Sequence, residues 1–197
     1  PPHFFARGEN PQYRYFGILM RYMNRVCEWI SGGRARAQVG VLYHAEAEWA
    51  SDRMMKTQEL VKLLTQAQIE ADILPIDALL NAQVEDGGLP LGECRYRALV
   101  VPYAEKLPAD TLNALGRLAR EGFRVIFAEG LPSGVSAGDA CPRTALAGCE
   151  VLSGENIIRA LDGMRLRTAR TARFEPDLKL YPYEKDGKSL FLMFNEG

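Results

Sequence analysis

Metal-ligating residues are scarce in this sequence. Its 197 residues include two histidines and four cysteines: His3, His44, Cys27, Cys94, Cys141 and Cys149. No C-x-x-C pair occurs among the cysteines, so the sequence argues against a structural zinc site. We expect neither a metal nor a cofactor. A domain of this size needs no disulfide for stability, so reduced thiols are expected, although a Cys141–Cys149 bridge across the intervening loop stays open.

A charge excess and a long apolar run are also missing. Lys and Arg number 24 against 25 Asp and Glu, and the formal net charge is -1. This balance provides no basic surface for nucleic acid. No apolar stretch approaches the ~20 residues that a membrane helix requires, and no signal peptide opens the chain. We therefore expect a cytoplasmic protein without nucleic-acid or membrane partners.

The ends of the chain have their own implication. It opens on Pro1-Pro2, without an initiator methionine, and it stops at Gly197 directly after an apolar segment. We interpret the chain as a piece excised from a longer protein.

What the sequence does contain is a repeated pattern of apolar runs that end in acidic or aromatic residues. The runs are residues 39–43, 73–76, 98–102 and 123–128. The side chains that follow them are His44, Glu46, Glu48, Trp49, Asp77, Tyr103, Glu105 and Glu129, which we call the rim residues. Because the carboxyl ends of parallel strands meet at one edge of a sheet, these residues are expected to share that edge.

Helical periodicity between the runs completes the fold prediction. Helices are expected at residues 11–30, 54–68, 108–121 and 155–162, with a helical turn at 77–81. The alternation of strand and helix predicts an α/β fold, a flavodoxin-like three-layer sandwich with a mostly parallel sheet.

Two further elements flank this sandwich. The helix at 11–30 forms an N-terminal helical arm, whose broad apolar stripe should be covered by this domain's sheet or by a neighbouring domain. Asp186-Gly187 is a strong turn signal between two apolar segments, at 178–183 and 189–194. These segments predict a C-terminal antiparallel hairpin.

Glycine is absent where nucleotide binding would need it. The turn after the first strand, residues 44–52, contains three carboxylates and no glycine, so it would repel a phosphate. Residues 130–139 are rich in Gly and Ser but lack a G-K-[ST] ending. We expect them to form a mobile surface loop.

A catalytic nucleophile is also absent from the place where this fold would hold one. Class I glutamine amidotransferases have the same layered fold and place a cysteine at a tight strand-to-helix elbow. None of the four cysteines lies at such an elbow, and Glu129-Gly130 follows the fourth strand without Cys or Ser. We therefore assign no catalytic residue.

The rim residues admit more than one interpretation. Glu46 and Glu48 lie two positions apart in a predicted loop and could converge as the paired carboxylates of a glycosidase, with Trp49 and Tyr103 as a sugar-stacking face. We favour a solvated or interface edge, because strand ends in α/β domains often carry exposed acids. His44 is expected to cap its strand by bonding to backbone or to a carboxylate. A basic stretch is expected to form a solvated sheet edge matched to nearby acids: Arg165, Arg167, Arg170 and Arg173.

Three segments resemble a known family. They are residues 13–33, 39–49 and 99–105, and the most specific stretches are Tyr-His-Ala-Glu-Ala-Glu-Trp and Val-Pro-Tyr-Ala-Glu. They resemble the middle region of large bacterial glycoside hydrolases, and the resemblance covers nearly the whole chain. It implies a glutamine-amidotransferase-like domain, similar to the trimerisation domain of family 42 β-galactosidases, between a catalytic TIM barrel and a β-sandwich. On this resemblance, residues 1–33 are the end of the barrel domain with its long helix, and residues 34–197 are the amidotransferase-like domain.

The resemblance transfers no catalytic residue, because the barrel carboxylates would lie upstream of this chain. We expect a non-catalytic accessory or assembly domain of a glycoside hydrolase, whose rim lines the carbohydrate site of the parent enzyme. Its expected partners are carbohydrate through that enzyme, a TIM barrel and further copies of the chain. Two alternatives stay open: a carbohydrate-binding module that uses Trp49 and Tyr103, and a self-contained hydrolase that uses Glu46, Glu48 or Glu129 with His44.

Overall fold

A five-stranded parallel sheet forms the centre of the computed structural model, which describes residues 11–136, 141 and 143–197. Its strands are β2 (Val39–Tyr43), β3 (Ala71–Pro75), β6 (Ala98–Val101), β8 (Arg124–Ala128) and β10 (Glu150–Leu152). They lie in the order β10-β8-β6-β2-β3, and each neighbouring pair is parallel. Counted along the chain this order is 2-1-3-4-5, the flavodoxin-like arrangement. The predicted fold class is confirmed.

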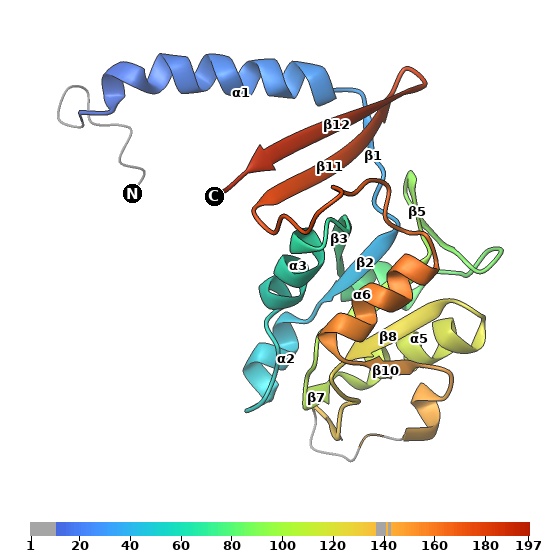
Figure 1. Cartoon of the computed structure of the whole chain (residues 1–197). Coiled ribbons are helices and arrows are strands. Elements are labelled where there is room, and N and C mark those ends of the chain that lie inside the picture. The colour runs from blue at the N-terminus through green and yellow to red at the C-terminus, as the bar shows by residue number, and fades with distance from the viewer. Residues whose placement is uncertain (1–10, 137–140, 142) are drawn as a thin grey trace.

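Helices cover both faces of this sheet (Figure 1). The helices on the two faces are α3 (Thr57–Gln66) with α6 (Gly154–Gly163), and α4 (Ile76–Leu80) with α5 (Ala109–Arg120). Alternate residues of a strand point to opposite faces. Accordingly, Val39 and Val41 of β2 pack with the α3–α6 cluster, whereas Leu42 packs with the α4–α5 cluster. Two apolar cores of buried side chains therefore hold the three layers together, and the core on the α4–α5 side includes the rings of Phe123 and Phe127.

An arm and a hairpin lie outside these layers. The arm is η2 (Tyr13–Tyr15) followed by α1 (Phe16–Ile30), and the hairpin is β11 (Leu178–Lys185) with β12 (Lys188–Asn195). The turn residues Asp186 and Gly187 both have positive φ, at 52° and 70°, as a two-residue type I′ turn requires. The short strand β1 (Arg34–Ala35) joins β11 to make a three-stranded antiparallel sheet. The predicted N-terminal helix and C-terminal hairpin are confirmed.

The structure adds elements that the sequence patterns did not predict. Residues 45–50 form a short helix, α2 (Ala45–Ala50), where a loop was expected. The fifth strand β10 was missed, as was a small hairpin of β4 (Leu89–Leu91) and β5 (Cys94–Tyr96). The predicted helix at 54–68 begins later, at Thr57, because the backbone of Met54 and Met55 pairs with the segment around Tyr103 and Ala104.

The predicted mobile loop at 130–139 is wrong for the part that the structure describes. Within it, β9 (Gly134–Val135) pairs in parallel with β7 (Lys106–Leu107), and Val135 is buried. The end of that loop and the irregular segment predicted at residues 1–10 lie outside the described residues.

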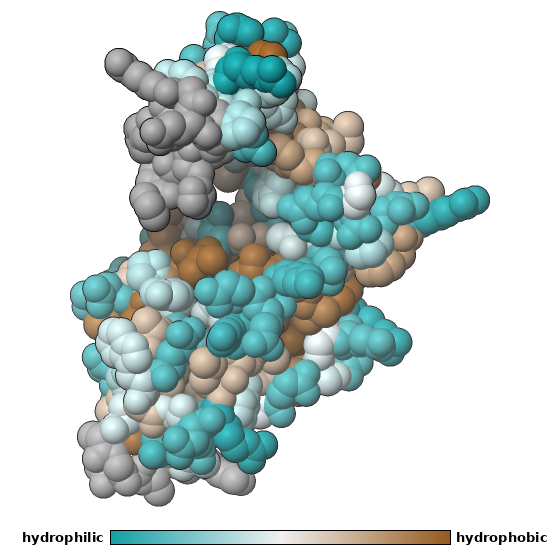
Figure 2. All heavy atoms as spheres, turned by 90° about the vertical axis from the view of Figure 1, so that its left-hand side faces the viewer, coloured by the Kyte–Doolittle hydropathy of each residue, from teal (hydrophilic) through white to brown (hydrophobic). Residues whose placement is uncertain are grey.

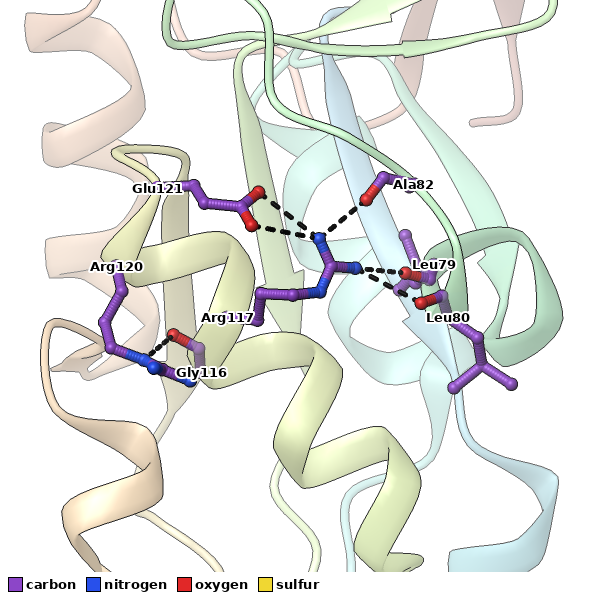
Figure 3. A network of polar contacts seen from close by, with 7 residues as sticks. All are labelled: Leu79, Leu80, Ala82, Gly116, Arg117, Arg120 and Glu121. Carbon is purple, nitrogen blue, oxygen red and sulfur yellow. Dashed lines mark hydrogen bonds and ion pairs between the residues drawn. The ribbon is translucent and has the colours of Figure 1, made fainter.

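One arginine fixes α4 to α5 (Figure 3). The guanidinium of Arg117 donates hydrogen bonds to the carbonyl oxygens of Ala82, Leu79 and Leu80, at 2.8, 3.3 and 3.2 Å. It also pairs with Glu121 on the next turn of α5, at 3.2 Å. Leu79 and Leu80 are the last residues of α4, whose carbonyls lack the usual partner four residues on, and Ala82 follows the helix, so Arg117 caps α4 from a neighbouring helix. Within the described residues, no helix is long and apolar enough to cross a bilayer.

Candidate functional site

The rim residues follow the carboxyl ends of the parallel strands. His44 follows β2, Tyr103 and Glu105 follow β6, and Glu129 follows β8. The chain order of the strands reverses between β2 and β6, and ligands of open α/β sheets bind at such switch points. The position is therefore a candidate site by topology, and the side chains decide whether it can perform chemistry.

His44 lies at the switch point but is enclosed. Its side chain is fully buried, and neither ring nitrogen has a hydrogen-bond partner among the residues that the structure describes. Burial lowers the pKa of His44, although the nearby backbone of Tyr103 and Met55 and the carboxylates of Glu48 and Glu46 oppose this. No hydrogen bond to the ring from the described part of the chain meets strict geometry, yet the backbone of Tyr103 and Met55 lies close enough to favour the charged ring, so the capping role of His44 stays a prediction. The ring is a buried neutral imidazole that reaches no substrate-accessible surface.

The carboxylates of Glu46 and Glu48 diverge. Both lie in the first turn of α2, and both are exposed. Two positions along an α-helix correspond to a rotation of about 200°, so their side chains leave opposite sides of the helix. The convergent pair that a loop would allow is not formed. Trp49 on the same helix is 84% exposed.

Glu129 has a structural role at the end of β8. Its backbone is left-handed, with φ of 64°, and the N–H of Gly130 donates to the carbonyl oxygen of Ala128 at 2.8 Å, which makes a tight turn. The Glu129 carboxylate accepts a hydrogen bond from the N–H of Gly154, the first residue of α6, at 2.9 Å. A carboxylate at a helix N-terminus satisfies an unpaired N–H and the helix dipole. The elbow is present, but a helix cap occupies it instead of a nucleophile.

The remaining rim residues are spread along the edge. Tyr103 is half-buried; its ring lies over Gly130, and its carbonyl oxygen accepts the N–H of Met55 at 2.7 Å. The backbone of Glu105 bonds to Arg53 and to the segment at 133–134, which holds the edge loops together. Asp77 is exposed in the first turn of α4. Tyr103 and Glu105 thus organise the edge through backbone bonds.

The cysteines provide no activated nucleophile. None of the four cysteines, all of which the structure describes, forms a disulfide, so the open Cys141–Cys149 bridge is not formed. Burial raises the pKa of Cys149 to about 11, which suppresses the reactive thiolate. No group of three or more His, Cys, Asp or Glu in the described part of the chain is arranged to hold a metal ion.

A carboxylate cluster that the sequence analysis missed lies at the other end of β3. Glu70 precedes this strand, and burial, followed by the charge of Asp72, raises its pKa to about 8. The Tyr96 hydroxyl donates to Asp72 at 2.8 Å, and burial raises the pKa of Tyr96. Burial also raises the pKa of Tyr181 and Tyr183 on β11, and the charge of Glu70 adds to this. The Glu70-x-Asp72 spacing, which places both side chains on one face of a strand, was the available signal.

Three cavities of the described residues lie elsewhere, and none of the rim residues lines them. The cavity of about 310 Å³ is lined by the end of α3 and by residues 167–175. Arg167, Arg170 and Arg173 belong to this lining, in the segment between α6 and β11. Arg165 lies in the same segment, so the predicted position of the four arginines on a sheet edge is wrong, whereas the expected match to a nearby acid holds for Arg167, which pairs with Asp162.

Comparisons with known proteins find similar structures but no similar sequence family. No protein-family model matches the sequence, and no curated protein is similar to it. Among solved structures, the chain is similar to the apo GH42 exo-carrageenase of Bacteroides ovatus, with a TM-score of 0.58 and 13% identity over 82% of this chain. It also matches β-galactosidases of Bacillus circulans sp. alkalophilus and Bifidobacterium adolescentis, with TM-scores of 0.45 and 0.39, identities of 15% and 19%, and coverage of 65% and 71% of this chain.

These matches also cover only part of each matched protein. The chain spans 23% of the exo-carrageenase and 18% and 56% of the two β-galactosidases. At 13% identity, the first match shows a shared fold, and the lower TM-scores of the other two add nothing to that conclusion.

Proposed function

We propose that the chain is a non-catalytic accessory domain of a glycoside hydrolase and that it packs through the α1 arm on the catalytic barrel of that enzyme. The observation that carries this proposal is the arm itself. None of the residues of α1 is buried, yet its apolar side chains repeat at helical spacing. An isolated amphipathic helix of this length is marginal in water, so its stability depends on a covering surface.

The exposed apolar surface of the arm is extensive. Ile18 and Trp29 are each 58% exposed, and Tyr22 is 54% exposed. The arm is tied to the hairpin at one end, where the Lys185 ammonium donates to the carbonyl oxygens of Glu28 and Trp29 at 3.0 and 3.2 Å. Figure 2 shows further hydrophobic surface between the arm and the α/β body. A surface of this kind on an otherwise polar domain is typical of an interface.

One observation supports the absence of catalysis and another supports the enzyme class. The rim holds a buried neutral histidine, diverging carboxylates and a glutamate tied to a helix cap, which leaves no paired acid and base in contact. The likeness to part of a GH42 exo-carrageenase supports the enzyme class, and its low coverage of that protein agrees with a domain role.

Self-association of the separate chain tests the proposal, because an arm without its barrel should cover its stripe with a second copy. We expect sedimentation velocity to detect association at tens of micromolar. Ile18→Lys with Tyr22→Lys should abolish it, whereas the control Asn24→Lys, on the polar face of α1, should leave it unchanged. A monomeric wild type whose α1 amides resist hydrogen exchange would contradict the proposal.

A second function is favoured by one side chain. Trp49 exposes most of its indole on α2, beside the switch-point edge, and a bare aromatic face is a platform for a sugar ring. The carbohydrate-binding alternative predicts that galactose or lactose shifts the fluorescence of Trp49 in a Trp29→Phe background. No shift at tens of millimolar sugar would reject it.

A further inference from the structure

The hollow between the end of α3 and residues 167–175 is a built cavity of about 310 Å³. Gln68 anchors it from beneath: the residue is buried and its backbone is left-handed, with φ of 59°. Its side-chain oxygen accepts hydrogen bonds from the N–H and hydroxyl of Thr171, at 2.8 and 3.1 Å, and its amide donates to Leu178 at 3.4 Å. The lining segment is thus held to buried Gln68 at Thr171, near its middle, and at Leu178, just beyond its end, so the site is preformed.

Three arginines line this cavity, and two of them have no carboxylate partner among the described residues. Arg167 pairs with Asp162 at 2.8 Å, and its buried Nε has no hydrogen-bond partner among the described residues. Arg170 and Arg173 form no ion pair within the part of the chain that the structure describes. Glu175 is the carboxylate in the lining. The cavity therefore has a surplus of guanidinium groups, which bind carboxylates, sulfates and phosphates through paired N–H donors.

A second arginine-lined cavity of about 600 Å³ provides a contrast within the same molecule. It contains Arg34, Arg36, Arg95 and Arg97, and the first three pair with Glu93, Glu184 and Glu85 respectively. Two of those acids, Glu93 and Glu184, line the cavity themselves. One of its four arginines, Arg97, forms no ion pair among the described residues, whereas two of the three arginines of the cavity at 167–175 form none.

An aromatic ring completes this cavity. Phe174 belongs to the lining and is 73% exposed, next in the chain to Arg173. Because most of the Phe174 ring is exposed, its face is available to contact a ligand in the cavity. A guanidinium pair beside a bare ring matches a ligand that combines an anionic group with the C–H face of a ring.

We propose that this cavity binds the anionic substituent of a saccharide, a sulfate ester or a carboxylate, with Arg170 and Arg173 on its oxygens and Phe174 against the sugar ring. This inference deepens the proposed function, because the choice of a saccharide as ligand rests on that function. The anion-binding part of the site rests only on the arginines. The site lies apart from the rim and from α1, so its test is independent of the association experiment.

Calorimetric titration in dilute buffer tests the proposal, with galactose 6-sulfate, galacturonate, galactose and sodium sulfate as probes. We expect one of the two charged sugars to bind at least tenfold more tightly than both galactose and sodium sulfate. Arg170→Ala with Arg173→Ala should weaken that binding at least tenfold. These residues are exposed, so circular dichroism should show an unchanged fold. The control Arg159→Ala, at an exposed arginine of α6, should change the affinity for the charged sugar less than twofold.

Phe174→Ala separates the two parts of the ligand. It should weaken the charged sugar severalfold and leave the weak binding of sodium sulfate unchanged. The proposal is overturned if neither charged sugar binds at about 10 mM, if sodium sulfate binds as tightly as they do, or if Arg159→Ala weakens binding as much as the double variant does.

Discussion

Replacing Glu70 by Gln tests how the cluster of Glu70, Asp72 and the β11 tyrosines affects stability. Burial and the Asp72 charge raise the pKa of Glu70 from its usual 4.5 to about 8. At about 1.4 kcal/mol per pKa unit, such a shift corresponds to at most about 5 kcal/mol. Because the carboxyl group is only partly buried, solvent screens the effect, and we expect about 1–3 kcal/mol.

The sign follows from linkage. Since the folded-state pKa lies above the unfolded one, the contribution of Glu70 is complete below about pH 4.5 and is lost as the pH rises to about 8. We therefore expect the free energy of unfolding of Glu70→Gln to lie within about 1 kcal/mol of the wild-type value at pH 5. At pH 8.5 it should exceed the wild-type value by about 1–3 kcal/mol.

Urea unfolding followed by far-UV circular dichroism at both pH values measures these free energies. Glu59→Gln, at an exposed glutamate of α3, is the matched control and should give the same difference from the wild type at both pH values. If Glu70→Gln also shows no dependence on pH, or if it is less stable than the wild type at pH 8.5, the reasoning is refuted.

Two further substitutions test contacts that hold the layers and the rim. Gly116→Ala should lower the free energy of unfolding by about 2–4 kcal/mol despite the better helix propensity of alanine, because its Cβ would lie 1.7 Å from the carbonyl oxygen of Ala145; thermal unfolding that matches the wild type would contradict this close approach. Glu129→Ala should cost about 1–2 kcal/mol by removing the cap of α6, whereas Glu129→Gln should retain part of the bond; equal stability of all three proteins in urea would exclude the cap.

Much of the fold was predictable because local patterns and tertiary packing agree. The runs at β2, β6 and β8 are buried on both faces, so their apolar character is continuous. The missed strand β10 has three residues and exposes Val151, which leaves no apolar run to detect. The missed helix α2 is only six residues long, shorter than helical periodicity can establish.

The site was less predictable because its contacts join distant segments. The position of Glu129 after a strand was foreseen, but its bond to Gly154 joins residues 25 positions apart. The arginine-lined cavity depends on Gln68, whose partner Thr171 is 103 residues away. Neither contact produces a periodic pattern in the sequence. The sequence therefore identified the charged residues along the chain but did not predict which distant residues they contact.

The most direct test of the central claim is turnover by the chain itself on a panel of p-nitrophenyl glycosides. We predict no release of nitrophenol above the buffer rate, because the rim holds no acid and base in contact. A turnover on the order of 1 s⁻¹ or more, within the range of ordinary enzymes, that disappears in Glu48→Gln while the fold is retained would contradict the account.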